Sequence, residues 1–192
     1  MTEKEKMLSG AAYFASDKTL VQERFAARKI LQQLQQIDID KVKQRAQLLK
    51  SLFGSSGKRL YVENTFHCDY GYNIHVGENF YANFNCTILD CASVHIGNDC
   101  LLAPNVSLYT ATHPLDPMER TKGVELAQPI TLGDHCWIGG NSVILPGVTL
   151  GNNVIVGAGS VVTKSFGDNV VIAGNPAKVI KKAPHSEGLK HT

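Results

Sequence analysis

Several features that would indicate a particular class of protein are missing from this sequence of 192 residues. The net charge is only +2, so nothing indicates binding to nucleic acid or to an acidic membrane surface. No apolar run approaches the roughly 20 residues that span a bilayer, and the N-terminus lacks the apolar stretch of a signal peptide. We therefore expect a cytosolic protein that binds neither nucleic acid nor membranes.

The cysteines and histidines do not form the pattern of a disulfide framework or of a metal site. There are five cysteines, an odd number, and no two of them have C-x-x-C spacing. No two histidines have the spacing H-x-H, H-x-x-x-x-H or H-E-x-x-H, so we expect no metal. A thiol nucleophile is chemically conceivable, but small buried thiols are the expected state of these cysteines.

What the sequence does contain is a six-residue repeat. Aliphatic residues recur at every sixth position of one long stretch: Leu132, Ile138, Ile144, Leu150, Val156 and Val162. A period of six is neither helical nor a simple alternation, but it fits short strands joined by turns in a parallel β-helix. We predict such a β-helix over residues 58–183, with Cys86, Cys100 and Cys136 at small inward positions.

The N-terminal residues have a helical pattern instead. Apolar residues form a stripe over residues 17–36, which Ser16 or Asp17 can cap, and a second helix is expected over about residues 40–53. We expect residues 1–57 to cover one end of the β-helix, whose strand edges would otherwise be unpaired. The polar tail, residues 184–192, is expected to be loose.

The repeat is interrupted between Leu108 and Leu132. The six-residue count would place Arg120 inside the narrow coil, where an unpaired charge is costly. We therefore predict that residues 109–129 leave the coil as a loop. This loop contains His113, and the following Pro114 holds the histidine in an extended backbone conformation. A histidine alone in a loop is usually only solvated, but here a regular scaffold is broken to display it.

Three more segments complete the set of motifs: Asp69–Asn73, Phe80–Asn85 and Pro129–Asp134. With these segments, the repeat and the His113 loop, the sequence resembles the maltose and galactoside O-acetyltransferases, which are hexapeptide-repeat acyltransferases, over nearly its whole length. The resemblance implies a left-handed β-helix that transfers acetyl from acetyl-CoA to a hydroxyl of a maltose- or glucose-like sugar. It also implies a homotrimer with active sites between neighbouring subunits.

The resemblance assigns roles to individual residues on the acceptor side. His113 matches the general base of a direct transfer that needs no acyl-cysteine. Asn83 matches a residue near the reacting carbonyl, unless it is an ordinary turn asparagine. Glu125 either orients the histidine, contacts the sugar or is a plain surface carboxylate. Asp69 matches a polar sugar contact, and Asp90 adjoins another.

The candidate cofactor contacts are Trp137, Gly140, Ala158, Thr163, Lys164, Lys178 and Lys181. The backbone N–H of Gly140 matches a donor to coenzyme A or to the developing oxyanion. Lys178 and Lys181 can meet the phosphates as point charges. Trp137 either packs on the coenzyme or lies at a subunit interface.

Two departures from the family pattern concern the acceptor. Phe14 follows Tyr13 where the family usually has aspartate, and Cys91 stands where some members have aspartate. Both changes remove polar groups, so the acceptor is expected to be less hydrophilic than maltose, or simply different. The alternatives are acetylation of another hydroxyl compound on the same fold and a trimeric binding protein without turnover. A metal hydratase is disfavoured because ligand histidines are missing.

Overall fold

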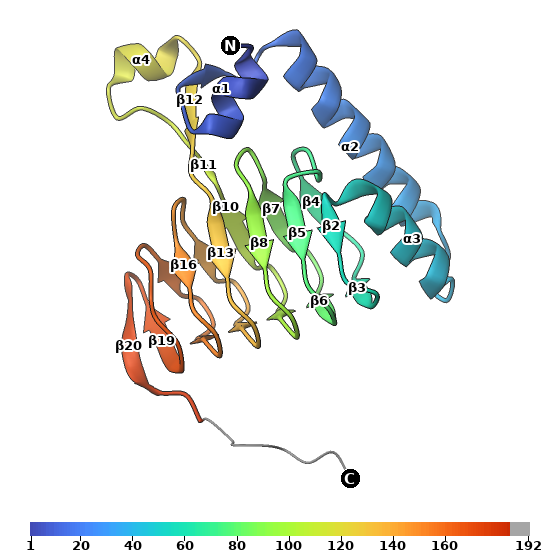
Figure 1. Cartoon of the computed structure of the whole chain (residues 1–192), viewed down its shortest axis with the longest axis vertical. Coiled ribbons are helices and arrows are strands. Elements are labelled where there is room, and N and C mark those ends of the chain that lie inside the picture. The colour runs from blue at the N-terminus through green and yellow to red at the C-terminus, as the bar shows by residue number, and fades with distance from the viewer. Residues whose placement is uncertain (185–192) are drawn as a thin grey trace.

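The computed structural model describes residues 1–184, and most of them form a left-handed parallel β-helix with three flat faces (Figure 1). The first sheet contains β2 (Ser55–Ser56), β5 (Ile74–Val76), β8 (Val94–Ile96), β13 (Ile130–Leu132) and β16 (Thr149–Leu150). The second sheet contains β3 (Leu60–Val62), β6 (Phe80–Ala82), β9 (Leu101–Leu102), β14 (Trp137–Ile138), β17 (Ile155–Val156), β19 (Val170–Gly174) and β20 (Ala177–Lys182). The third sheet contains β4 (His67–Cys68), β7 (Thr87–Leu89), β10 (Ser107–Tyr109), β15 (Val143–Ile144) and β18 (Val161–Val162). The chain visits the three sheets in turn, so the predicted β-helix is confirmed.

The six-residue repeat forms the inward stacks of this prism. Leu132 lies between Ile96 and Leu150 in the first sheet, and Ile138 lies between Leu102 and Val156 in the second. All six side chains are at most 3 % exposed, and burial of each such side chain contributes about 1.5–3 kcal/mol. The three cysteines predicted to lie in the core are buried there, and the other two are buried as well.

The corner between the first and second sheets is built by asparagine and aspartate. At one position of each turn, residues such as Asn79, Asp99 and Asn153 have positive φ, which these residue types tolerate. At the neighbouring position, side-chain oxygens cap the backbone of the adjacent coil. Asn98 Oδ1 accepts from Glu78 N–H at 2.8 Å, and Asp134 Oδ1 accepts from Asn98 N–H at 2.7 Å. These bonds fix the register of successive coils.

Three helices form the cap at the N-terminal end: α1 (Glu3–Ser9), α2 (Lys18–Gln36) and α3 (Val42–Leu52). The predicted pair is confirmed with slightly shorter bounds, and Asp17 caps α2 as expected. The short helix α1 was not predicted. Arg45 of α3 is buried and donates to the Leu34 carbonyl at 3.0 Å and to Asn64 Oδ1 at 2.7 Å. It therefore ties both helices to the first coil.

The segment expected to be a plain loop, residues 109–129, is more ordered than that. It contains β11 (Ala111–Thr112), α4 (Pro117–Thr121) and β12 (Val124–Ala127), and β11 pairs with β12 as an antiparallel hairpin. Strand β12 also pairs with β1 (Tyr13–Phe14) of the N-terminal segment. The hairpin projects from one edge of the prism next to α1 (Figure 1). Pairing satisfies backbone groups that an open loop would leave to water.

The wide turn between β7 and β8 surrounds a buried carboxylate. Asp90 is fully buried and accepts from the N–H groups of Asp69 at 3.0 Å, Tyr70 at 2.9 Å and Asn73 at 3.3 Å. Asp90 thereby holds the turn that follows β4 in the coil below.

Within residues 1–184, no helix is both long and apolar enough to cross a bilayer. The predicted loose tail lies outside the described residues, apart from Pro184.

A prediction follows for the pH dependence of stability. Burial is the main cause that raises the pKa of the Asp90 carboxyl, from about 4 to about 6. Between these values the folded chain holds a proton that the unfolded chain has released, so this contribution to stability is lost as pH rises. Asp90→Asn removes the titration.

We expect the free energy of unfolding of the native chain to fall relative to that of Asp90→Asn between about pH 4 and pH 6. Urea unfolding of both proteins across this range measures the difference. Parallel pH profiles would contradict the assignment.

Candidate active site

A cavity of about 260 Å³ opens where the hairpin leaves the prism. Its lining consists of Ala15, Arg24, Asp69, Leu89, Cys91, Ala111, His113 and Glu125. Three of the residues predicted for the acceptor side, His113, Glu125 and Asp69, therefore meet in one place. His113 directly follows β11, Glu125 lies on β12, and Asp69 directly follows β4, which is distant from both in sequence.

His113 is held from one side of its ring. Its Nδ1 lies 3.4 Å from the carbonyl oxygen of Val124, across the hairpin. In the tautomer with a proton on Nδ1, the ring donates to this carbonyl, and Nε2 keeps a lone pair that can accept a proton. The geometry thus suits a base.

Glu125 is not the partner of His113 in this arrangement. Its Oε2 accepts from the Tyr13 hydroxyl at 2.8 Å. The sequence offered Glu125 as one candidate for orienting the His113 ring, but the Val124 carbonyl faces the ring nitrogen. The Glu125 carboxylate instead forms part of the cavity wall.

Asp69 and Asp90 have different surroundings, although both were candidate acceptor contacts. Asp69 lines the cavity, and the Cys91 thiol lies 3.5 Å from its Oδ2 as a weak donor. Burial raises the pKa of Asp69 and that of Cys91. The Asp90 carboxylate is fully buried and committed to backbone N–H groups, so the structure does not support a direct contact with an acceptor.

Arg24 is a cavity residue that the sequence reasoning missed. It lies on α2 and donates to the Tyr70 hydroxyl and to the Ala15 carbonyl, both at 2.7 Å. An arginine in an amphipathic helix carries no signal that distinguishes it from a solvated one. Phe14 is half exposed and does not line the cavity. Its neighbour Ala15 lines the cavity instead.

Asn83, Gly140 and Ala158 lie away from this cavity, at the corner between the second and third sheets. They occur in stacked turns of that corner, after β6, β14 and β17 respectively. Asn83 Oδ1 accepts from Phe84 N–H at 2.8 Å. The N–H groups of Gly140 and Ala158 have no hydrogen-bond partner within residues 1–184, so both can serve a ligand.

The remaining cofactor candidates lie on the second sheet and directly after β18. The Trp137 side chain is 51 % exposed on the outer face of the second sheet. Thr163 and Lys164 are exposed directly after β18, and Lys178 and Lys181 are exposed on β20. The structure therefore distributes these residues over different coils and sheets, and none of them lines the His113 cavity. Among residues 1–184, no three His, Cys, Asp or Glu side chains are placed to hold a metal ion.

Comparison with known proteins gives two family matches. Residues 6–57 match the maltose acetyltransferase hexapeptide capping motif, and residues 129–164 match the hexapeptide repeat of succinyl-transferase. A galactoside O-acetyltransferase of Escherichia coli K12 is 40 % identical over 178 residues, which cover 93 % of this chain and 88 % of that protein.

Solved structures agree closely with this fold. A maltose O-acetyltransferase from Clostridium difficile 630 has a TM-score of 0.94 and 51 % identity, covering 96 % of this chain and 99 % of that one. A galactoside acetyltransferase in complex with coenzyme A has a TM-score of 0.92 and 37 % identity, covering 100 % and 98 %. The chain belongs to the maltose and galactoside O-acetyltransferase family of hexapeptide-repeat acetyltransferases.

Proposed function

We propose that this acetyltransferase moves the acetyl group of acetyl-CoA to a hydroxyl of a maltose- or glucose-like sugar, with His113 as general base. The observation that carries the proposal is the cavity in which His113 lies beside two carboxylates, with Nδ1 at the Val124 carbonyl and Nε2 without a hydrogen-bond partner among residues 1–184. Carboxylates and an imidazole are suitable partners for sugar hydroxyls, since each accepts hydrogen bonds.

In the proposed reaction, acceptor and thioester are bound together. His113 Nε2 takes the hydroxyl proton as the acceptor oxygen attacks the thioester carbonyl, which gives a tetrahedral oxyanion. The intermediate collapses by breaking the carbon–sulfur bond, and the imidazolium returns the proton to the leaving thiolate. No cysteine is acylated, which agrees with the burial of all five thiols.

The corner between the second and third sheets suits the coenzyme. Free N–H groups at Gly140 and Ala158 can bind the pantetheine amides, and the Gly140 N–H can also stabilise an oxyanion. A side chain at Gly140 would place a Cβ 3.1 Å from the Pro104 carbonyl oxygen, so glycine keeps the backbone accessible. Trp137, Thr163 and the lysines Lys164, Lys178 and Lys181 would contact the rest of the coenzyme.

A homotrimer would bring the two corners together. Asn83 lies where strands of the third sheet begin, and His113 lies beyond the point where they end. One subunit therefore does not form a complete site. If three copies pack with their third sheets toward a threefold axis, the His113 edge of one copy adjoins the Asn83 edge of the next. We also infer a cytosolic setting, which five unpaired thiols support.

The wall of the cavity also suits an acceptor other than a sugar. Cys91, Leu89 and two alanines, Ala15 and Ala111, make part of the cavity wall apolar. This wall favours an acceptor that presents an apolar face beside its hydroxyl, so the alternative is acetylation of a less polar hydroxyl compound on the same fold. A trimeric binding protein without turnover is the second alternative.

Replacement of His113 tests the chemistry. We expect His113→Ala to lower acceptor-dependent release of free thiol from acetyl-CoA by about 10²–10⁴-fold, because the base is lost. Binding of acetyl-CoA, measured by calorimetry, should stay within about twofold of the native value, since Gly140 and Ala158 lie at another corner.

His135→Asn is the matched control. His135 is exposed at the corner between the first and second sheets, where its φ of +59° suits asparagine. This variant should keep native turnover. Unchanged turnover in His113→Ala would refute the role of His113 as general base. Absence of turnover with every sugar and hydroxyl compound tested would support the alternative of a binding protein without turnover.

Subunit mixing tests the shared site. His113→Ala and Asn83→Ala are each expected to be nearly inactive, whereas refolding them together should restore roughly a quarter of native activity, because random mixing pairs an intact His113 with an intact Asn83 at that frequency. Refolding His113→Ala with the double variant provides the control, which should stay inactive. If mixing restores nothing, the two residues do not meet across subunits.

A further inference from the structure

Tyr13 is a buried residue that the proposed mechanism does not use. Only 1 % of its surface is exposed, and it does not line the cavity. Its hydroxyl donates to Glu125 Oε2 at 2.8 Å, although the two residues are 112 positions apart. A buried hydroxyl without a hydrogen bond is costly, and the bond to Glu125 removes that cost for Tyr13.

The direction of the hydrogen bond is fixed by burial. Desolvation raises the pKa of Tyr13 well above its usual range, with the neighbouring Cys91 and Glu125 acting in the same direction. The phenol therefore keeps its proton and donates it to the Glu125 carboxylate. One oxygen of Glu125 is thereby held toward the protein interior.

The backbone reinforces this contact. Tyr13 pairs with Glu125 and Phe14 pairs with Val124 in the antiparallel ladder between β1 and β12. Val124 provides the carbonyl that faces His113 Nδ1. The N-terminal segment thus holds two neighbouring residues of β12 that both act on the cavity.

We propose that Tyr13 is a positioning residue that works through Glu125: its hydroxyl holds the carboxylate so that one wall of the acceptor cavity is set beside His113. The inference rests on the proposed function, because it assigns the acceptor to this cavity. Without the hydroxyl, the Glu125 carboxylate is free to turn toward Arg24 or His113, which line the same cavity. The acceptor then meets a wall of different shape and charge.

A double-mutant cycle between Tyr13→Phe and Glu125→Ala tests this role. We expect Tyr13→Phe to raise the KM for the acceptor about three- to tenfold, the usual net effect of one hydrogen bond, and to leave the KM for acetyl-CoA unchanged. In the Glu125→Ala background the same replacement should have no further effect on the acceptor KM, because the residue that transmits it is gone. If Glu125→Ala does not fold, Glu125→Leu serves in its place, because leucine is larger than alanine but has no acceptor for the Tyr13 hydroxyl. The Tyr13→Phe effect on the acceptor KM should again be absent.

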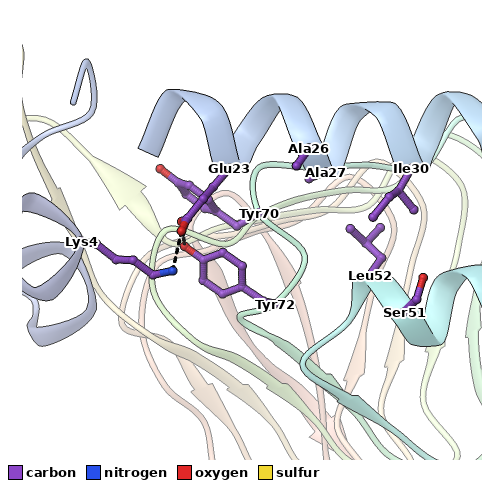
Figure 2. Close-up of a pocket in the computed structure, with 9 residues that line it drawn as sticks. All are labelled: Lys4, Glu23, Ala26, Ala27, Ile30, Ser51, Leu52, Tyr70 and Tyr72. Atoms are coloured by element: carbon purple, nitrogen blue, oxygen red, sulfur yellow. Dashed lines mark hydrogen bonds and ion pairs between the residues drawn. The ribbon is translucent and has the colours of Figure 1, made fainter. Parts of the chain in front are cut away.

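The matched control is Tyr72→Phe. The Tyr72 hydroxyl also donates to a glutamate, Glu23 of α2, at 2.8 Å, and Lys4 pairs with the same carboxylate at 2.7 Å (Figure 2). This tyrosine–glutamate bond lies in a separate pocket under α2 that does not include His113. Tyr72→Phe should therefore leave both KM values unchanged, even if it lowers the melting temperature as much as Tyr13→Phe.

Each outcome separates the inference from the function on which it rests. Additive effects of Tyr13→Phe and Glu125→Ala on the acceptor KM, or equal effects of Tyr13→Phe and Tyr72→Phe, would overturn the positioning role while turnover stands. A native chain that releases no thiol with any acceptor would overturn the proposed function and the inference together.

Discussion

The stacking of successive coils at a fixed register is the constraint on which the rest of this molecule depends. Backbone hydrogen bonds run from coil to coil, and aliphatic side chains such as Leu132 and Ile138 lie directly above their counterparts. Because the interior is too narrow for an unpaired charge, polar groups that do chemistry lie outside it, and the cavity with His113 forms where the chain leaves the coil. The corners therefore become the functional parts of the structure.

In the proposed reaction, two of the corners would carry different halves of the chemistry. The corner between the third and first sheets holds Asp69, Cys91 and the hairpin with His113. The corner between the second and third sheets holds Asn83 and the free N–H groups of Gly140 and Ala158. Within one subunit, the strands of the third sheet separate these two corners. Under the proposed function the two corners would meet only in an oligomer, which is why the proposed site needs a second copy.

The hairpin shows how the cap contributes beyond covering strand edges. Strand β1 of the N-terminal segment pairs with β12, and Tyr13 bonds to Glu125 at the same point. The excursion is thus braced against residues more than a hundred positions earlier. A base that must meet its substrate within a fraction of an ångström benefits from such support, because its position is then set by packing and not by a free loop.

The sequence alone determined the β-helix, because a six-residue period of aliphatic residues can be satisfied only by stacked short strands. It also identified the interruption with His113, since Arg120 could not lie inside the coil. The tertiary structure decided the rest. It showed that the excursion is a hairpin braced by β1, that Val124 and not Glu125 faces the imidazole, and that Asp90 is buried while Arg24 lines the cavity. These are contacts between segments far apart in the chain, and local patterns contain no information about which polar side chains will meet across such distances.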